Sequence, residues 1–456
     1  MRRGPSRRSR KRRVRPVFPA LWLSARGVWA LLAVAVALAL AGAFPVLLGV
    51  AFALAAAFFA LLGLDAARGP HGRDLRLTRL ETGSQALRRR GELGYRLENR
   101  AGIAIRAGLY ETPVPTLRFE RESLDVRVGP RSFAEATLGF LPLERGRVRL
   151  DAVYLWVENA IGLLRRRYVA PEALELRVFP DLSAIESRGV LAKRATALQA
   201  GLRKLRMRGV GSEFESLREY LPGDSFRAID WKASARRGRL MVEQTEVERN
   251  QHVLVLLDAG RLMLARLGPQ RKFDYALTAA LSVARIAQAA GDNVGFIAFG
   301  AKPLLTLAPR RGIAHMTALA EAAFDLQPRR EEPDYETILT GVKQRYTKRS
   351  LIVLFSDMFD PAGSAALLAG LATLVPRHLV MCVLMNDEAI ASALDAPPHD
   401  VREAYRTSVA MLLADERAVA MATLRAKGII VVDVPAPSLS VAVLDAYLEV
   451  KSKGRL

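Results

Sequence analysis

Two aspartates, each at the end of a run of apolar residues, are the side chains whose type and spacing could support chemistry. Asp258 follows the run Val253-Leu-Val-Leu-Leu257, and Asp357 follows the run Ser350-Leu-Ile-Val-Leu-Phe-Ser356. Continuous apolar runs of this length are typical of parallel strands that are covered on both faces. Ligands of such sheets bind beyond the carboxyl ends of the strands, where both aspartates fall. Two carboxylates in one crevice favour a hard cation with oxygen ligands, typically Mg²⁺, so Asp258 and Asp357 are candidate metal ligands.

Other catalytic chemistry has few candidate residues in this sequence. A phosphatase that uses an aspartate after its first strand also needs an acid two residues later, where this chain has Gly260. The sequence has no Gly-x-x-x-x-Gly-Lys-Ser/Thr phosphate-binding loop, which argues against an ATPase. The five histidines are scattered without ligand spacing, and the single cysteine, Cys382, lies in an apolar run that predicts an inert core thiol. We therefore expect no catalytic residues and a reducing compartment.

The stretch 209–246 is too polar for a core and too patterned for a linker. Both signs of charge alternate with aromatic residues, and apolar Leu217, Leu221 and Ile229 recur between them. Such a run folds only if its ions are paired against a scaffold. The segment Pro222-Gly223-Asp224 predicts a turn, because Pro fixes φ and Gly accepts a positive φ. A solvated, charged connector is the alternative interpretation.

From Leu217 to Arg236 the chain reads L-R-E-Y-x-P-G-D-x-x-R-x-I-D-W-K-x-x-A-R. This order of residue types resembles the signature of the bacterial domain of unknown function 58 family. We expect the signature to form either an ion network that joins two domains or a face that docks a partner, with Trp231 as its apolar anchor. The signature residues of this chain are Arg218, Glu219, Tyr220, Gly223, Asp224, Arg227, Asp230, Trp231, Lys232 and Arg236.

The resemblance also implies an architecture, a metal site and a partner. Proteins of that family join the signature to a von Willebrand factor A-like domain, whose metal site has Asp-x-Ser-x-Ser, then a Thr, then an Asp. This chain reads Asp258-Ala-Gly-Arg-Leu262, so both hydroxyl ligands are absent, and Thr337 is the nearest candidate for the Thr. Mg²⁺ binding stays open against a second interpretation, in which backbone donors or arginine satisfy Asp258 and Asp357. The family is commonly paired with MoxR-type AAA+ ATPases, which implies such a partner here.

An uncharged segment near the start of the chain predicts a membrane anchor. No charged residue occurs between Arg26 and Asp65. Since a membrane-spanning helix needs about 20 apolar residues, we expect spans near Val28–Phe44 and Val46–Leu64, separated by Pro45. A cleaved signal peptide is the alternative, but the run is too long for one. Basic residues flank both ends, which under the positive-inside rule places both termini in the cytoplasm, at a bacterial inner membrane.

The basic charge of the chain is concentrated at its start. The net charge is +22, and nine basic residues fall within residues 1–15 with no acid among them. This tail can hold acidic lipid headgroups at about 1 kcal/mol per basic residue. A membrane-surface nucleic-acid binder that uses the tail is a third hypothesis. We expect no specific nucleic-acid partner, because we see no basic stripe with stacking aromatics along a folded face.

Changes in composition and in hydrophobic pattern divide the chain into five regions. Alternation of apolar and polar residues predicts an all-β, immunoglobulin-like sandwich. Alternation of strands and helices predicts a doubly wound α/β domain. A helical, basic segment is expected over 185–208, before the signature. The regions are a basic cytoplasmic tail (1–26), a transmembrane hairpin (27–64), the sandwich (75–182), a connector with the signature (183–250) and the von Willebrand A-like α/β domain (251–456).

Two functions from different classes follow. The first is a multidomain, membrane-anchored, cytoplasm-facing adaptor that works by protein–protein contact, with an AAA+ ATPase of MoxR type as the partner that the resemblance implies. The alternative is a divalent-metal-dependent ligand-binding or hydrolytic domain at Asp258 and Asp357.

Overall fold

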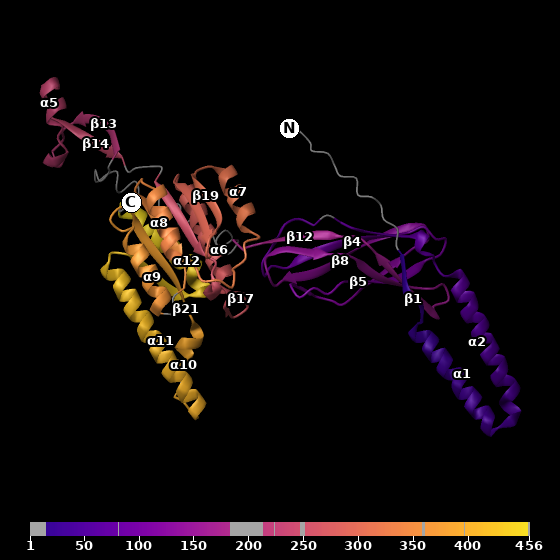
Figure 1. Cartoon of the computed structure of the whole chain (residues 1–456). Coiled ribbons are helices and arrows are strands. Elements are labelled where there is room, and N and C mark those ends of the chain that lie inside the picture. Colours follow the sequence, from indigo (N-terminus) through magenta and orange to yellow (C-terminus); the bar gives the residue numbers. More distant parts are fainter. Residues whose placement is uncertain are drawn as a thin grey trace. The chain divides into compact units, whose positions relative to one another are not determined.

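The computed structural model of the 456-residue chain describes residues 15–80, 82–182, 213–222, 224–246, 251–357, 361–395 and 397–454 (Figure 1). The chain divides into two compact units, Met1–Phe179 and Pro180–Leu456. The first fourteen residues of the basic tail, the expected helical segment 185–208 and Gly223 lie outside the described residues.

Two apolar helices begin the first unit after a short strand. Helix α1 spans Ala25–Ala43 and helix α2 spans Leu48–Arg68, and both are long and apolar enough to cross a membrane. The helical turn between them, Pro45–Leu47, begins with the proline, whose fixed φ suits that position. We expected Arg15–Leu23 to belong to the basic tail. These residues instead form strand β1, which pairs with a strand of the sandwich.

The strands that follow α2 form the expected β-rich sandwich. They lie in sheets of order β1-β11-β10-β5-β7, β2-β4-β8-β6 and β3-β12-β9. Alternate side chains fill the core between them, as the period of two in strands requires. The strands are β2 (Leu75–Arg79), β3 (Gln85–Ala86), β4 (Gly91–Asn99), β5 (Ile105–Glu111), β6 (Leu117–Phe119), β7 (Leu124–Val128), β8 (Ser132–Pro142), β9 (Gly146–Leu150), β10 (Val153–Glu158), β11 (Leu164–Ala170) and β12 (Leu174–Phe179).

The signature forms a small module of the second unit. Strand β13 (Glu213–Glu219) pairs in antiparallel fashion with strand β14 (Met241–Glu246). A single turn of 3₁₀-helix, Phe226–Ala228, and the short helix α5 (Trp231–Arg237) connect the two strands. Helix α5 ends at Gly238, whose positive φ of 67° suits a glycine at a helix C-terminus.

The rest of the second unit is an α/β domain with one six-stranded sheet. The strand order is β19-β18-β15-β20-β21-β22, and all neighbours are parallel except β18 and β19. The strands are β15 (His252–Asp258), β18 (Asn293–Phe299), β19 (Pro303–Arg310), β20 (Ser350–Phe355), β21 (Leu379–Asn386) and β22 (Ile430–Pro435). The strands β16 (Arg266–Leu267) and β17 (Gln270–Arg271) form a separate hairpin.

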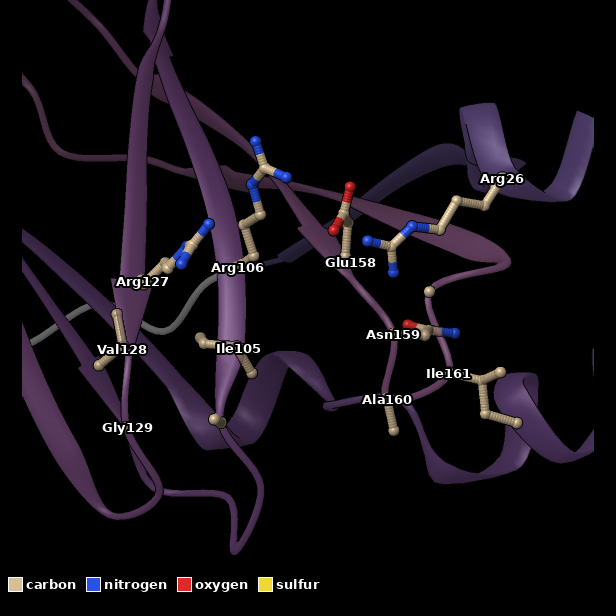
Figure 2. Close-up of a pocket in the computed structure, with 12 residues that line it drawn as sticks. Arg26, Ile105, Arg106, Arg127, Val128, Gly129, Glu158, Asn159, Ala160 and Ile161 are labelled. Atoms are coloured by element: carbon tan, nitrogen blue, oxygen red, sulfur yellow. The ribbon is translucent and has the colours of Figure 1, made fainter.

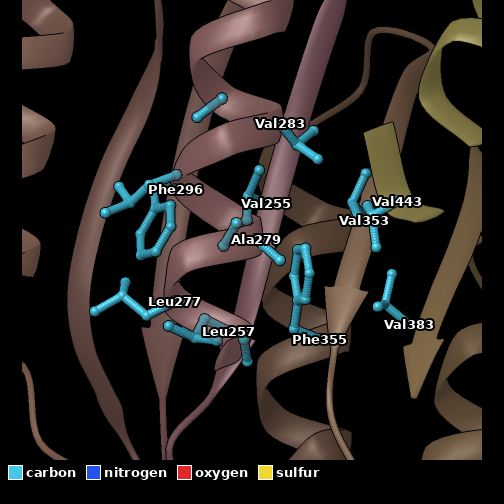
Figure 3. Packing of buried hydrophobic residues seen from close by; sticks show 14 of the residues in the cluster. Val255, Leu257, Leu277, Ala279, Val283, Phe296, Val353, Phe355, Val383 and Val443 are labelled. Carbon is cyan, nitrogen blue, oxygen red and sulfur yellow. The ribbon is translucent and has the colours of Figure 1, made fainter. Parts of the chain in front are cut away.

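Helices cover both faces of this sheet. The helices are α6 (Lys272–Ala289), α7 (Ile313–Ala323), α8 (Tyr335–Arg345), α9 (Pro361–Ala372), α10 (Glu388–Asp395), α11 (Val401–Ala426) and α12 (Leu439–Ser452). One core packs α6, α7 and α12 against Val253, Val255 and Leu257 of β15, and Figure 3 shows part of it. The other packs α8, α9 and α11 against Leu254 and Leu256. Successive side chains of β15 thus enter opposite cores, so the strand is apolar without alternation.

Candidate functional site

The two aspartates that the sequence selected lie at the same edge of the α/β sheet. Strands β15 and β20 are parallel neighbours with Leu257 opposite Phe355, and Asp258 and Asp357 come at or just beyond their carboxyl ends. Both carboxylates are buried. Because a buried carboxylate needs partners to offset its lost hydration, the groups around each one decide what this edge can bind.

Asp258 is held by three neutral donors. The backbone N–H of Gly260 donates to Oδ1 at 2.7 Å, while the hydroxyls of Tyr335 and Ser356 donate to Oδ2 at 2.6 and 2.7 Å. Burial raises the pKa of Asp258, although these hydrogen bonds act in the opposite direction. Burial and the neighbouring carboxylate also raise the pKa of Tyr335, so its hydroxyl stays a donor.

Asp357 is neutralised by two cations from the protein itself. Lys272, the first residue of α6, places its Nζ 2.5 Å from Asp357 Oδ2, and the side chains of this pair are 1% and 0% exposed. Arg417 of α11 approaches Asp357 Oδ1 at 3.2 Å and also pairs with Asp433 at 2.7 Å. Lys272, Asp357, Arg417 and Asp433 form an ion network at the strand ends, in which the first two are buried and the other two half-buried. We call it the carboxyl-edge network.

The donor set around these aspartates does not fit a bound Mg²⁺. The ammonium of Lys272 already supplies positive charge to Asp357, and hydroxyl donors occupy Asp258. Among the residues that the structure describes, no group of three His, Cys, Asp or Glu side chains could hold a metal ion. A hard cation would have to displace Lys272 from a buried contact. The two carboxylates therefore have the character of structural residues, satisfied by protein donors.

The loop after β15 leaves no room for a serine at position 260. A Cβ atom at Gly260 would lie 2.7 Å from Pro333 Cδ and 3.1 Å from the carbonyl oxygen of Glu331. The same loop is tied down by a hydrogen bond from Arg261 N to Glu331 O at 2.9 Å. A serine at 260 thus requires the segment around 331–333 to move, so the departure from Asp-x-Ser-x-Ser is built into the packing.

Thr337 does not reach the aspartates. It lies exposed in the first turn of α8, and its N–H donates to Asp334, the residue that caps this helix. Tyr335, two residues earlier, supplies the hydroxyl that contacts Asp258. The roles of Tyr335, Lys272 and Arg417 at this edge were not predicted from the sequence. A lysine at the start of a mostly apolar helix was the available signal for Lys272, but nothing local connects it to Asp357.

The described ion pairs of the signature residues lie inside the signature module. Arg218 makes two parallel hydrogen bonds to Asp224, at 2.7 and 2.6 Å, and Leu221 N donates to the same carboxylate. The Arg218 hydrogen bonds lower the pKa of Asp224, with a smaller contribution from Leu221 N. Glu219 pairs with Arg239 at 3.3 Å. The Asp224 carboxylate thus fixes the turn that follows β13.

Asp230 acts as the N-cap of α5. Its Oδ1 accepts hydrogen bonds from Lys232 N at 2.9 Å and Ala233 N at 3.0 Å. Lys232 and Arg236 project from this helix into solvent, and Arg227 lies in the 3₁₀ turn. The polar signature residues Arg218, Asp224 and Asp230 therefore build the turn and the helix start of the module.

Three large apolar side chains within the signature stretch, of which Trp231 is a signature residue, are left exposed. The exposed fractions of Leu221, Phe226 and Trp231 are 60%, 71% and 66%. The ring of Tyr220 lies 5.8 Å from that of Phe226. These three large apolar side chains are exposed on one small module, and exposed apolar side chains offer a surface that a partner can cover. We call Leu221, Phe226 and Trp231 the exposed apolar triad.

A clamp between the two apolar helices and the sandwich was not foreseen from the sequence. Asp65, near the end of α2, is fully buried and accepts from the backbone N–H groups of Ile161, Leu163 and Leu164 at 2.7, 2.9 and 2.8 Å. Ser24, the N-cap of α1, donates its hydroxyl to Gly162 O at 2.5 Å. The loop between β10 and β11 is thus bound by the ends of both helices.

The chain is similar in sequence to bacterial proteins that are themselves uncharacterised. An uncharacterised protein of Mycobacterium tuberculosis (strain H37Rv), Rv1480, is 23% identical over 181 residues, and the aligned part covers 39% of this chain and 56% of that protein. Uncharacterised protein YeaD of Bacillus subtilis (strain 168) is 49% identical over 43 residues, 9% of this chain and 11% of that protein. The chain thus spans little more than half the length of the mycobacterial relative.

Among solved structures, the ASH / PapD-like domain of human CEP192 covers 23% of this chain and 82% of that domain, at 10% identity and a TM-score of 0.17. A family model matches residues 216–418, which contain the whole signature, Asp258, Asp357 and most of the α/β sheet. That family is described as "Protein of unknown function DUF58", and residues 216–418 of this chain are similar to it.

Proposed function

We propose that the protein is a membrane-anchored scaffold that docks a partner protein through its signature module. The observation that carries this proposal is the exposed apolar triad Leu221, Phe226 and Trp231. Aromatic side chains dominate the binding energy of protein interfaces, and a surrounding set of charged residues suits the rim of such an interface. Here Lys232 and Arg236 supply exposed charges on the same helix as Trp231.

The internal ion pairs favour a docking face over a strut between domains. Arg218 and Asp224 satisfy each other within the module, and Asp230 is used as a helix cap. These ions therefore have partners without reaching another domain. The apolar triad, in contrast, gains burial only when something covers it, at about 25 cal/mol per Å² of apolar surface removed from water.

The proposed partner is an AAA+ ATPase of MoxR type, which the protein would assist in the assembly or activation of other proteins. The support is the resemblance of the signature from Leu217 to Arg236. We further propose that the α/β domain is von Willebrand A-like, supported by its six-stranded, mostly parallel sheet with an aspartate at the end of β15. Helices α1 and α2 would anchor the chain in a bacterial inner membrane, with both termini in the cytoplasm.

The test is a pull-down from solubilised membranes with the full chain as bait. We expect an AAA+ ATPase, identified by mass spectrometry, to co-purify with the wild type and to be lost with Trp231→Ala plus Phe226→Ala. Ile313→Ala, which truncates another exposed apolar side chain at the start of α7, is the matched control and should retain the ATPase. Absence of an AAA+ ATPase from the wild-type eluate, or its retention by the double variant, contradicts the proposal.

The alternative function, a metal-dependent domain at Asp258 and Asp357, has a test of its own. Ligand binding to the folded state stabilises it, so a functional site should raise the thermal midpoint when Mg²⁺ replaces a chelator. We expect no change, because Lys272 already neutralises Asp357. A midpoint that rises with Mg²⁺ concentration in the wild type, and does not rise in Asp258→Asn, would restore the metal hypothesis.

A further inference from the structure

A pocket of about 340 Å³ lies in the first unit, between the start of α1 and the edge of the sandwich (Figure 2). Its volume falls within the range of sites that hold small molecules. Three arginines line it from separate elements: Arg26 from α1, Arg106 from β5 and Arg127 from β7. Glu158, at the end of β10, is the one acidic residue among the lining residues.

Two of these arginines oppose each other across a strand pair. Arg106 and Arg127 are direct partners in the antiparallel ladder of β5 and β7. Like charges at directly opposed positions destabilise a sheet, because their side chains lie close together on one face. An anion bound between the two guanidinium groups reverses the sign of this interaction.

Arg26 adds a third positive charge at an unfavourable position. It occupies the first turn of α1, where the helix dipole disfavours a cation and no acidic residue is present. Its guanidinium lies above the loop between β10 and β11, where a Cβ at Gly162 would be 3.3 Å from Arg26 Nη1. In Figure 2 the side chain of Arg26 extends toward Glu158 and Arg106.

The acidic residues near the pocket pair with only some of the arginines, so a net positive charge remains. Glu158 pairs with Arg165 at 2.8 Å, and Arg106 pairs with Asp125 at 3.1 Å. Within the described part of the chain, Arg26 and Arg127 have no ion pair. The pocket therefore offers two uncompensated guanidinium groups, with Arg106 between them and Glu158 as the charge that a ligand must avoid.

We propose that this pocket binds the phosphate group of an anionic phospholipid. Guanidinium groups bind phosphate with paired hydrogen bonds, which explains three arginines around one small pocket. The pocket opens at the first turn of a helix that is apolar enough to cross a membrane. Trp22 and Trp29, which flank Arg26 in the sequence, are exposed, and tryptophan is typical of membrane interfaces. The inference that a lipid supplies the phosphate depends on the proposed membrane anchoring. The inference that the three arginines bind a phosphate does not depend on it.

The test uses the full chain in lipid nanodiscs and measures the modification of individual arginines by phenylglyoxal with mass spectrometry. We expect Arg26, Arg106 and Arg127 to be protected when phosphatidylglycerol is mixed into phosphatidylcholine discs. Arg118 and Arg121 are exposed and lie outside the pocket, so their modification rates should not change. Protection of all five arginines alike, or of none, overturns the proposal. Protection by inorganic phosphate in phosphatidylcholine discs reassigns the pocket to a soluble ligand.

A second arm separates failure of the pocket from failure of the anchoring. If the chain does not enter nanodiscs, the proposed membrane anchoring is wrong, and the pocket is then tested in solution with dioctanoylphosphatidylglycerol. Arg26→Gln plus Arg127→Gln should weaken its binding by about tenfold or more, because each lost hydrogen bond to a charged group is worth about 1.5–3 kcal/mol. The charge-matched variant Arg118→Gln plus Arg121→Gln should bind as the wild type does. Equal affinities of the two variants exclude the pocket.

Discussion

Lys272 carries the stability of the carboxyl-edge network. Its ammonium contacts Asp357, and both side chains are fully enclosed. Lys272→Met removes the cation and leaves a buried carboxylate with Arg417 as its remaining cationic partner in the network. Because breaking a buried pair typically costs 3–5 kcal/mol, we expect the α/β domain to lose stability of about that size. Denaturant titration of the solubilised full chain, followed by hydrogen exchange in β20, measures the loss.

Lys302→Met is the control for this prediction. Lys302 is exposed in the turn between β18 and β19, so removing its charge should change the stability by less than about 0.5 kcal/mol. A Lys272→Met variant as stable as Lys302→Met would show that Arg417 alone satisfies Asp357. The network would then not need Lys272.

Asp258, at the same edge of the sheet, makes the folding stability depend on pH. Burial raises the pKa of Asp258 in the folded state above its ordinary value of 3.8. The folded state then binds the proton more tightly than the unfolded state. The contribution of this carboxyl to stability is therefore complete below pH 3.8 and is lost as the pH rises through the folded-state pKa. Asp258→Asn does not titrate, so it isolates the contribution.

The expected result is a difference that changes in one direction with pH. The unfolding free energy of the wild type minus that of Asp258→Asn should fall as the pH rises from 3.8 through the folded-state pKa. Hydrogen exchange of β15 amides across this range provides the measurement. A difference that increases with pH would mean that the hydrogen bonds from Gly260, Tyr335 and Ser356 outweigh burial, and that the pKa is lowered.

At the scale of elements, one carboxylate connects the apolar helices to the sandwich. Asp65 accepts three backbone hydrogen bonds from the loop between β10 and β11 and from the first residue of β11. Asp65→Ala leaves these N–H groups without their acceptor, and an unsatisfied buried donor costs about 1–3 kcal/mol. We expect the amides of Ile161, Leu163 and Leu164 to lose protection from hydrogen exchange, while the core strands of the sandwich retain theirs.

Glu92→Ala provides the comparison, because Glu92 is an exposed acid of β4 in the same unit. It should leave the exchange of the three loop amides unchanged. Equal protection in Asp65→Ala and in the wild type would mean that the loop is held by the strands β10 and β11 alone. Asp65 would then not be the residue that connects helix to sandwich.

The elements that can be predicted from the sequence are those with a clear local pattern. Strands β15, β18, β20, β21 and β22 are mostly apolar runs, which can be assigned as strands without knowing which strand pairs with which. Strand β11 is harder to predict, because its consecutive residues Arg165, Arg166 and Arg167 obscure the alternation. Strand β19 is also harder to predict, because it begins at Pro303 and lies at an edge of the sheet.

The candidate site was less predictable than the elements for a physical reason. The edge position of Asp258 and Asp357 follows from strand direction, which local sequence encodes. The partners of Asp357, in contrast, come from 85 and 60 residues away along the chain, so their pairing depends on how α6 and α11 pack. The three donors to Asp65 likewise lie 96 to 99 residues away. Charge type alone does not identify such pairs.

At the scale of the whole molecule, membrane topology decides whether the proposed scaffold is possible. The signature module can meet a cytoplasmic ATPase only if the sandwich and everything after it lie in the cytoplasm. Helices α1 and α2 form a hairpin with a short turn at Pro45–Leu47, so the turn must then face the opposite side of the membrane. Thiol labelling can distinguish these positions, because the chain has a single cysteine.

Cys382 is a silent background for this experiment, since it is fully buried and burial raises the pKa of its thiol to about 12. Val46→Cys introduces a thiol in the exposed turn between α1 and α2, and Ser132→Cys introduces one at an exposed position of β8. In intact spheroplasts, a membrane-impermeant maleimide should label Val46→Cys. It should label Ser132→Cys only after permeabilisation. The reverse pattern would place the sandwich outside the cytoplasm and exclude a cytoplasmic ATPase as the partner of the signature module.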